Sequence, residues 1–253
     1  MKTVVCIALT LMFAAGPVAA TPCVADSGAQ RVTLLELYTS EGCNSCPPAD
    51  RWASSLPARG LGPDQVVTLA YHVDYWNDLG WEDPFAQTRF TERQQFANAR
   101  IGNRTIYTPQ FMLDGQDYRQ WRSHDGIRQR IASADDEQPG ADIKLALDSA
   151  TDVLDVDARV TLRRASDGAS VFVALYENKL ASQVTAGENA GKRLEHDFVV
   201  RELAGPFDVD TAAIRHRFRV SQAWKPRNLA VAVFVQSAVT GEVLQAMALP
   251  WCD

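Results

Sequence analysis

Two cysteines separated by two residues, in the segment Cys43-Asn44-Ser45-Cys46, stand where an apolar strand pattern gives way to a helix start. Residues 32–38 predict a buried strand, and residues 47–53 predict a helix because two leading prolines are tolerated in a first helical turn. A thiol at a helix N-terminus faces unpaired backbone N–H groups and the positive end of the helix dipole, which favour the thiolate. The thiolate attacks disulfides and binds soft metals. The pair therefore predicts thiol–disulfide redox chemistry.

The composition sets broad limits on the class of protein. The chain has 253 residues, enough for one large domain or two of ordinary size. Hydrophobic residues make up 46% and charged residues 22%, which predicts a globular chain with a substantial core. The formal net charge is -6 and no long basic stretch occurs, which argues against nucleic acid as a partner.

The N-terminus has the pattern of a secretory signal peptide over residues 1–20. Lys2 supplies the positive charge, residues 4–15 are apolar, and small residues at 18–20 precede an expected cleavage before Thr21. The apolar stretch is shorter than the roughly 20 residues of a membrane span, so we favour cleavage over an uncleaved anchor. We expect an exported protein, periplasmic or secreted, with no membrane span after cleavage.

The cysteine positions predict two disulfide pairs. Cys6 is lost with the signal peptide, and an even number of cysteines then remains, which suits an oxidising compartment. Cys23 lies near the mature N-terminus and Cys252 is the penultimate residue. We predict a structural disulfide between Cys23 and Cys252, which leaves Cys43 and Cys46 as the working pair.

The first half of the chain alternates strand and helix patterns. A second buried strand is expected over 65–73, then a helix with Asp83 as its N-cap running towards Arg100. A strand over 109–113, an Asp114-Gly115 turn and a last helix after Ser123 follow. This order, with a dithiol at the first strand–helix junction, is the thioredoxin arrangement. We therefore predict an α/β thioredoxin-like domain over residues 21–138.

The second half changes to a period of two. Residues 154–162 and 214–220 alternate apolar and polar side chains, as half-buried strands do. Further strands are expected at 143–147, 171–176, 194–200, 229–235 and 243–249. A polar segment at 135–142 marks the expected domain boundary. Short strands separated by turns predict an all-β antiparallel sandwich-like domain over residues 139–253.

Four sequence motifs carry a family resemblance. They are LELYTSEGCNSCPPAD at 35–50, HVDYW at 72–76, LGWEDPF at 79–85 and YTPQ at 107–110. Through them the chain resembles a bacterial family of exported thioredoxin-like proteins catalogued only as a domain of unknown function. The resemblance implies a thioredoxin-like fold over most of the mature chain, but it implies no substrate.

The resemblance also implies roles for four residues. Cys43, nearer the turn and expected to be the more exposed, would attack, and Cys46 would resolve the mixed disulfide. Pro109 matches the cis-proline that faces the dithiol in thioredoxin, and the backbone of Thr108 would pair with an extended substrate. The partners would be protein thiols and disulfides. The residues between the two cysteines differ from those of thioredoxin, so the direction of exchange and the potential stay open.

Glu36 is a candidate proton acceptor for Cys46. It lies between two leucines in a strand expected to be covered on both faces. Burial raises the pKa of a carboxyl group, which suits a general base for the resolving thiol. The alternative is a carboxylate paired with an arginine or with turn amides.

The loop after the second strand offers further candidates. Trp76 and Trp81 could present a substrate-binding surface, although aromatic loop residues more often pack beneath the loop. His72 ends the strand, where functional groups collect in parallel sheets. His72 with Cys43 and Cys46 could instead bind copper, which makes a copper-delivery protein the alternative function.

A non-catalytic binding module with an inert Cys43–Cys46 disulfide is the other alternative. The prediction for the main interpretation is no cofactor beyond the protein's own sulfurs. His196 and His216 each alternate in phase with apolar residues, so we interpret both as core residues and assign neither to a metal.

Overall fold

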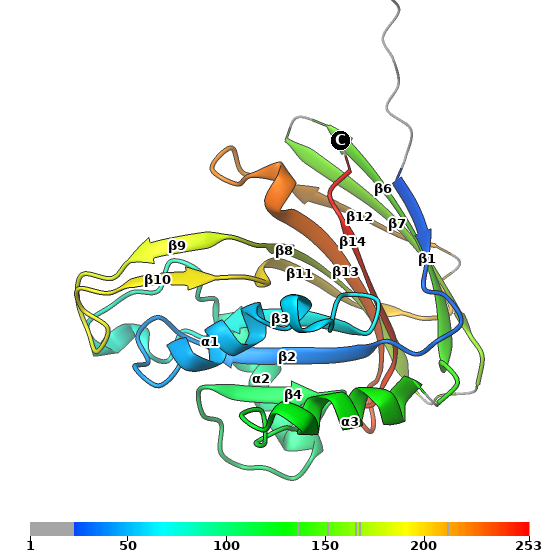
Figure 1. The fold of residues 1–253 in the computed structure, drawn as a ribbon. Helices are drawn as coiled ribbons and strands as arrows, with labels where there is room; N and C mark the ends of the chain where they lie inside the picture. Colours follow the sequence, from blue (N-terminus) through cyan, green and yellow to red (C-terminus); the bar gives the residue numbers. More distant parts are fainter. Residues whose placement is uncertain are drawn as a thin grey trace, which may run out of the picture.

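The computed structural model describes residues 23–135, 137–150, 152–164, 166, 168–211 and 213–252. The predicted signal peptide at residues 1–20, with Cys6, lies outside these described residues. Figure 1 shows three helices packed around a large twisted sheet, with a second sheet at the end where β1 and β14 lie.

The described residues form fourteen strands and three α-helices. In chain order these are β1 (Cys23–Asp26), β2 (Thr33–Thr39), α1 (Pro47–Ser54), β3 (Val66–His72), α2 (Thr88–Arg100), β4 (Gln110–Leu113), β5 (Gln116–Asp117), α3 (His124–Asp135), β6 (Ala141–Ala150), β7 (Val153–Leu162), β8 (Ala169–Glu177), β9 (Leu180–Gln183), β10 (Arg193–His196), β11 (Val199–Asp208), β12 (Ile214–Arg219), β13 (Leu229–Ser237) and β14 (Val243–Pro250).

One mixed sheet of eight strands runs through the molecule in the order β14-β13-β8-β11-β3-β2-β4-β5. β2 and β3 are parallel, as their near-continuous apolar sequences favour, whereas β4 runs antiparallel to β2. The two halves of the chain meet where β11 pairs in parallel with β3. There the N–H of Ala70 donates to the carbonyl of Phe198 at 2.8 Å. Strands from both halves therefore share one hydrogen-bonded sheet.

This sheet overturns the predicted fold class of an α/β thioredoxin-like domain followed by an all-β sandwich-like domain. The protein is mostly β-structure, with three α-helices among its described residues and large mixed and antiparallel sheets. Local periodicity identified most strands correctly, but it carries no information on which distant strands pair. The parallel contact between β11 and β3 joins segments that the sequence analysis had assigned to separate folds.

Three apolar cores cover the two faces of the large sheet. On one face, α2 packs over side chains such as Leu34, Tyr38 and Tyr71. On the opposite face, α1 and α3 cover the β2–β3–β4 region, where Leu35 and Leu37 are buried. The same face of β8 and β13 packs against the four-stranded sheet β1-β6-β7-β12. Adjacent residues of β2 thus belong to different cores, because successive strand side chains point to opposite faces.

Two local predictions also require correction. Asp83 is not a helix N-cap, because α2 begins at Thr88 and its N-cap residue is Gln87. The carboxylate of Asp83 instead accepts from the backbone N–H groups of Glu41 at 2.8 Å and Phe85 at 2.9 Å. The strand expected at 194–200 is interrupted at Phe198, whose φ is 61°, so that β10 and β11 are separate strands.

Candidate dithiol site

Cys43 and Cys46 lie in the turn between β2 and α1 and are joined as a disulfide. Both cysteines are 0% exposed, whereas Asn44 and Ser45 between them are exposed. The sequence analysis expected Cys43 to be the more exposed of the two, and in this oxidised state it is covered. The turn therefore presents its two middle residues to solvent while both sulfurs lie beneath the surface.

The helix start supplies fewer anion-stabilising donors than the sequence analysis assumed. Cys46 is the N-cap of α1, and the first helical positions are Pro47 and Pro48, which have no N–H to offer a thiolate. The N–H of Ala49 already donates to the carbonyl of Cys46 at 2.8 Å. The hydroxyl of Ser45 lies 3.3 Å from the Cys43 sulfur. A neighbouring hydroxyl favours a thiolate by donating to it.

The segment joining β9 and β10 covers the dithiol turn. The side-chain amide of Asn189 donates to the carbonyls of Glu41 at 2.8 Å and of Cys43 at 3.0 Å. The carboxylate of Glu188 accepts from the N–H of Asn44 at 3.0 Å. Figure 1 shows the β9–β10 hairpin extending beside α1. A segment almost 150 residues downstream therefore holds the backbone on both sides of Cys43.

A cluster of buried ionisable side chains lies at the carboxyl ends of β2 and β3, on the face that α1 covers. His196 Nε2 lies 3.0 Å from a carboxylate oxygen of Glu41, and His72 Nδ1 lies 2.7 Å from Asp83. Asp50 accepts from the hydroxyl of Thr39 at 2.9 Å, and its second oxygen is 3.9 Å from His196 Nδ1. The His72 and His196 rings pack edge to face, 5.0 Å apart. Five ionisable groups therefore form one network, comprising Glu41, Asp50, His72, Asp83 and His196.

Burial and mutual contacts shift the pKa values within this network. Burial raises the pKa of Asp50, and the charges of His196 and His72 offset this only in part. For His72, burial alone would lower the pKa, but the charge and hydrogen bond of Asp83, with the charges of Asp50 and Glu41, together raise it. Burial acts to raise the pKa of Asp83, but the charge and hydrogen bond of His72, with the backbone N–H groups of Glu41 and Phe85, together lower it. The structure therefore favours a protonated His72 beside an ionised Asp83 and makes a protonated Asp50 easier to form.

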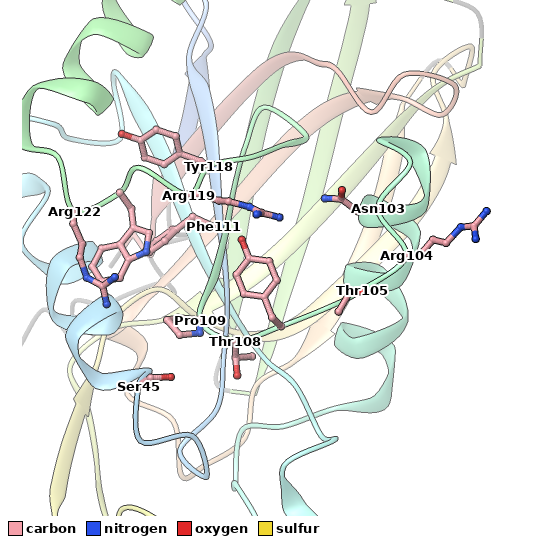
Figure 2. Close-up of a pocket in the computed structure, with 12 residues that line it drawn as sticks. Ser45, Asn103, Arg104, Thr105, Thr108, Pro109, Phe111, Tyr118, Arg119 and Arg122 are labelled. Carbon is pink, nitrogen blue, oxygen red and sulfur yellow. The ribbon is translucent and has the colours of Figure 1, made fainter.

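Thr108 and Pro109 form a wall of a pocket of about 600 Å³ that Ser45 also lines. The Thr108–Pro109 peptide bond is cis. Figure 2 shows Pro109 between Ser45 and Phe111, with Thr108 next to Pro109. The structure thus brings the exposed face of the dithiol turn and the Thr108–Pro109 segment to the same hollow. The other residues of the pocket include four aromatic side chains, Tyr107, Phe111, Tyr118 and Trp121.

The indole N–H groups of Trp76 and Trp81 donate hydrogen bonds to residues beside the dithiol turn. Trp76 donates to the hydroxyl of Thr108 at 2.8 Å, and Trp81 donates to the carboxylate of Glu41 at 2.8 Å. A Cβ added at Gly42 would lie 3.1 Å from the Cβ of Trp76, so this glycine permits a close approach. Neither tryptophan belongs to the pocket lining. Both are half-buried and hold the turn and the Thr108 wall in place.

Glu36 lies on the opposite face of the sheet from α1. It is 1% exposed and pairs with Arg93 of α2, whose Nε lies 2.6 Å from its carboxylate. Its neighbours Leu35 and Leu37 face the core beneath α1, so the side chain of Glu36 points away from Cys46. The structure therefore does not bring together the proton acceptor and the thiol that the sequence analysis combined. Glu36 is instead a carboxylate paired with an arginine, which was the alternative interpretation.

Cys43, Cys46 and His72 are not arranged as a set of copper ligands in this structure. The two cysteines are joined to each other, and His72 is bound to Asp83. Within the described part of the chain, no three His, Cys, Asp or Glu side chains are grouped so that they could hold a metal ion.

The remaining predicted residues lie away from the turn. Cys23 and Cys252 are joined by a disulfide that links the first described strand to the C-terminal end. His216 is half-buried, with its ring 4.5 Å from that of Phe218. Across residues 23–252, apart from the five undescribed positions, no helix has the length and apolar character needed to cross a membrane.

Sequence analysis missed several residues that the fold brings to the dithiol turn. Glu41 and Asp50 stood within a recognised motif but without an assigned role. His196 was interpreted only as a core residue, because alternation reveals burial and not the partner across the fold. Asn189 received no role, and its two hydrogen bonds connect positions far apart in sequence. No local pattern carries such contacts.

Comparison with known proteins agrees with the motif resemblance at the level of the family. A family model described as "Protein of unknown function (DUF1223)" matches residues 34–236. This match spans well over half of the chain, so the protein belongs to that family. Among curated proteins, none matches the sequence.

Two solved structures resemble this one. Protein AGR_C_4864 from Agrobacterium tumefaciens is 28% identical with a TM-score of 0.63, over 89% of this chain and 97% of that one. HBP35 of Porphyromonas gingivalis is 15% identical with a TM-score of 0.66, over 88% of this chain and 76% of that one. The second likeness concerns the fold alone.

Proposed function

We propose that the protein is an exported thiol–disulfide oxidoreductase that exchanges its Cys43–Cys46 pair with protein thiols and disulfides. The observation that carries the proposal is the position of this pair beside a pocket. Ser45, an exposed residue of the turn, and the Thr108–Pro109 wall line one hollow of about 600 Å³. A disulfide that only stabilises the fold needs no such space, whereas exchange requires a partner's sulfur to approach.

The exchange reaction needs only the sulfurs of the two proteins. In the reducing direction, the Cys43 thiolate attacks one sulfur of the partner's disulfide, which forms a mixed disulfide and releases the other sulfur as a thiolate. The Cys46 thiolate then attacks the Cys43 sulfur and releases the partner's second thiolate. The partner gains two electrons and two protons, and the protein's dithiol becomes a disulfide again. Oxidation of a partner is the same sequence in reverse.

The buried network supplies a proton acceptor that Glu36 does not. Asp50 lies four residues after Cys46, which places the two residues on the same side of α1. The N–H of Asp50 donates to the carbonyl of Cys46 at 3.1 Å. Because burial raises its pKa, Asp50 accepts a proton more readily than an exposed aspartate does and can return it to solvent later.

Export is part of this proposal and is supported by the N-terminal sequence. The charged, apolar and small-residue pattern of residues 1–20 is that of a cleaved signal peptide. An oxidising compartment would also maintain the Cys23–Cys252 disulfide.

One observation favours a second candidate, the non-catalytic module. Both sulfurs of the Cys43–Cys46 disulfide are fully covered in the oxidised state. A disulfide that stays covered resists exchange, because a partner's thiolate cannot reach it. The proposal therefore requires that the residues covering Cys43 move away from its sulfur when a partner binds.

Trapping distinguishes the two candidates. The mature protein with Cys46→Ala keeps the attacking sulfur but cannot resolve a mixed disulfide. In an extract from the exported fraction we expect it to form dithiothreitol-sensitive adducts with partner proteins through Cys43. The Cys43→Ser,Cys46→Ala variant is the control and should form none. Equal adduct formation by both variants, or none by either, would contradict the oxidoreductase proposal.

A further inference from the structure

The pocket beside the dithiol turn has an unusual charge for this protein. Three of its lining residues are Arg104, Arg119 and Arg122, and no carboxylate stands among the described side chains that line it. The chain as a whole has a formal net charge of -6. All three arginines are exposed. A positive hollow on an acidic protein attracts negatively charged partners and repels positively charged ones.

Two of the three arginines stack on aromatic rings of the pocket. The guanidinium of Arg122 lies 4.4 Å from the centre of the Trp121 ring, and that of Arg119 lies 5.6 Å from the Tyr107 ring. Stacking of this kind holds a guanidinium in place while its N–H groups remain free to donate. In Figure 2, Arg122 lies at the end of the pocket near Ser45, and Arg104 lies at the opposite end.

The three arginines differ in whether a carboxylate of the protein already pairs with them. Arg119 pairs with Asp117, whose carboxylate lies 2.7 Å from its Nε, but its side chain is 71% exposed. Asp117 also accepts from the hydroxyl of Tyr107 at 2.7 Å. Among the side chains that the structure describes, no carboxylate pairs with Arg104 or Arg122. Positive charge at both ends of the hollow therefore remains available to a ligand.

We propose that this pocket binds an acidic, extended segment of the partner polypeptide next to the partner's reacting cysteine. The inference rests on the proposed function and specifies its substrate class. Carboxylates of the segment would pair with Arg104 and Arg122 at the two ends of the pocket, and apolar parts would lie on the aromatic floor. Arginine suits this role because its planar fork matches a carboxylate with two N–H donors. Ser45 and Pro109 at the near end would place the segment's cysteine beside the turn.

Binding of matched peptides tests the inference independently of redox chemistry. The probes are two extended peptides of equal length whose central cysteine is replaced by serine, one flanked by Asp and Glu and the other by Asn and Gln. Fluorescence anisotropy of labelled peptide at low salt gives the two affinities for the mature protein. We expect the acidic peptide to bind roughly tenfold more tightly, with a preference that shrinks as salt is added. Equal affinities of the two peptides would overturn the inference.

Variants locate the preference on the protein. Arg104→Gln,Arg122→Gln should lower the affinity for the acidic peptide to that of the amide peptide. Arg215→Gln,Arg217→Gln is the matched control, because it also removes two positive charges, from exposed arginines of β12 in the other sheet. If the control loses as much affinity as the pocket variant, the attraction comes from overall charge and not from the pocket.

A third measurement separates this inference from the proposed function. Hydroxyethyl disulfide is small and uncharged, so its reduction by the dithiol reports the sulfur chemistry alone. If the wild-type protein reduces it but shows no preference between the peptides, the substrate class is wrong and the oxidoreductase proposal stands. If the acidic peptide binds preferentially but no disulfide is exchanged, the pocket assignment stands and the oxidoreductase proposal fails.

Discussion

The imidazole of His196 lies 3.0 Å from the carboxylate of Glu41, although the two residues are 155 positions apart in the chain. Glu41 stands two residues before the first cysteine of the dithiol turn, and His196 ends β10. Both residues are buried. This contact joins the β9–β10 hairpin to the dithiol turn, so the hairpin forms part of the dithiol site.

Replacing His196 should destabilise the whole fold. His196→Phe keeps a ring in the core but leaves the buried Glu41 carboxylate without its imidazole partner, which costs about 3 kcal/mol. Urea unfolding of the mature protein measures this loss. His216→Phe is the control, since His216 is half-buried and contacts aromatic rings, and it should change stability by less than about 1 kcal/mol. A similar loss in both variants would argue against a specific role for the Glu41 contact.

Removing the amide of Asn189 should uncover Cys43. Asn189→Ala leaves the carbonyls of Glu41 and Cys43 without their donor, which costs about 1–3 kcal/mol. We expect reduction of the Cys43–Cys46 disulfide by dithiothreitol to become several-fold faster. Asn178→Ala is the control, because Asn178 accepts from the N–H of Phe198 beyond the hairpin and does not touch the turn. Unchanged reduction in Asn189→Ala would show that the hairpin does not control access.

The pair of His72 and Asp83 should make stability depend on pH. The folded protein holds the pKa of His72 above its ordinary value of 6.5, because the charge and hydrogen bond of Asp83, with the charges of Asp50 and Glu41, together outweigh burial. Its contribution is therefore fully present below about pH 6.5 and is lost as the pH rises through the pKa of the folded state. Urea unfolding from pH 5 to pH 9, in roughly one-unit steps, should show this decline in the wild-type protein and a flatter profile in His72→Gln. If the stability of the wild-type protein and of His72→Gln fell in parallel with pH, the His72–Asp83 pair would not be the source of the decline.

Asp50 should assist the resolving step. A mixed disulfide between Cys43 and thionitrobenzoate releases the coloured thiol when Cys46 attacks, so absorbance follows that step directly. We expect Asp50→Asn to slow release about tenfold or more near neutral pH, because its amide cannot accept the Cys46 proton. Glu36→Gln is the control on the other face of the sheet, and it should reduce stability but leave the release rate unchanged. Slower release in Glu36→Gln alone would restore the earlier assignment of the base.

Some features of this fold follow from short stretches of sequence. The turn of Asp114 and Gly115 was predicted, and both residues have positive φ values, of 49° and 79°, between β4 and β5. The strand–turn–helix unit around the cysteines was predicted as well, since apolar runs and paired prolines act locally. These features depend on residues within a few positions of one another.

Other features depend on contacts that no local pattern contains. Alternation shows that the even-numbered residues of β2 share a face, but not that α2 and Arg93 cover it, so Glu36 was assigned to the wrong side. The pairing of β11 with β3 and the bond of Asn189 to Cys43 join distant segments in the same way. The fold class and the buried network therefore required the structure.

Equilibration in a glutathione redox buffer tests the central claim most directly, with the Cys23–Cys252 disulfide as an internal reference. The state of each pair is read by alkylation and mass spectrometry of the native protein. We predict that Cys43–Cys46 equilibrates reversibly at a potential of roughly -270 to -120 mV, while Cys23–Cys252 stays oxidised. If Cys43–Cys46 remains oxidised at all of these potentials, or is reduced only together with Cys23–Cys252, the pair is structural and the oxidoreductase proposal is wrong.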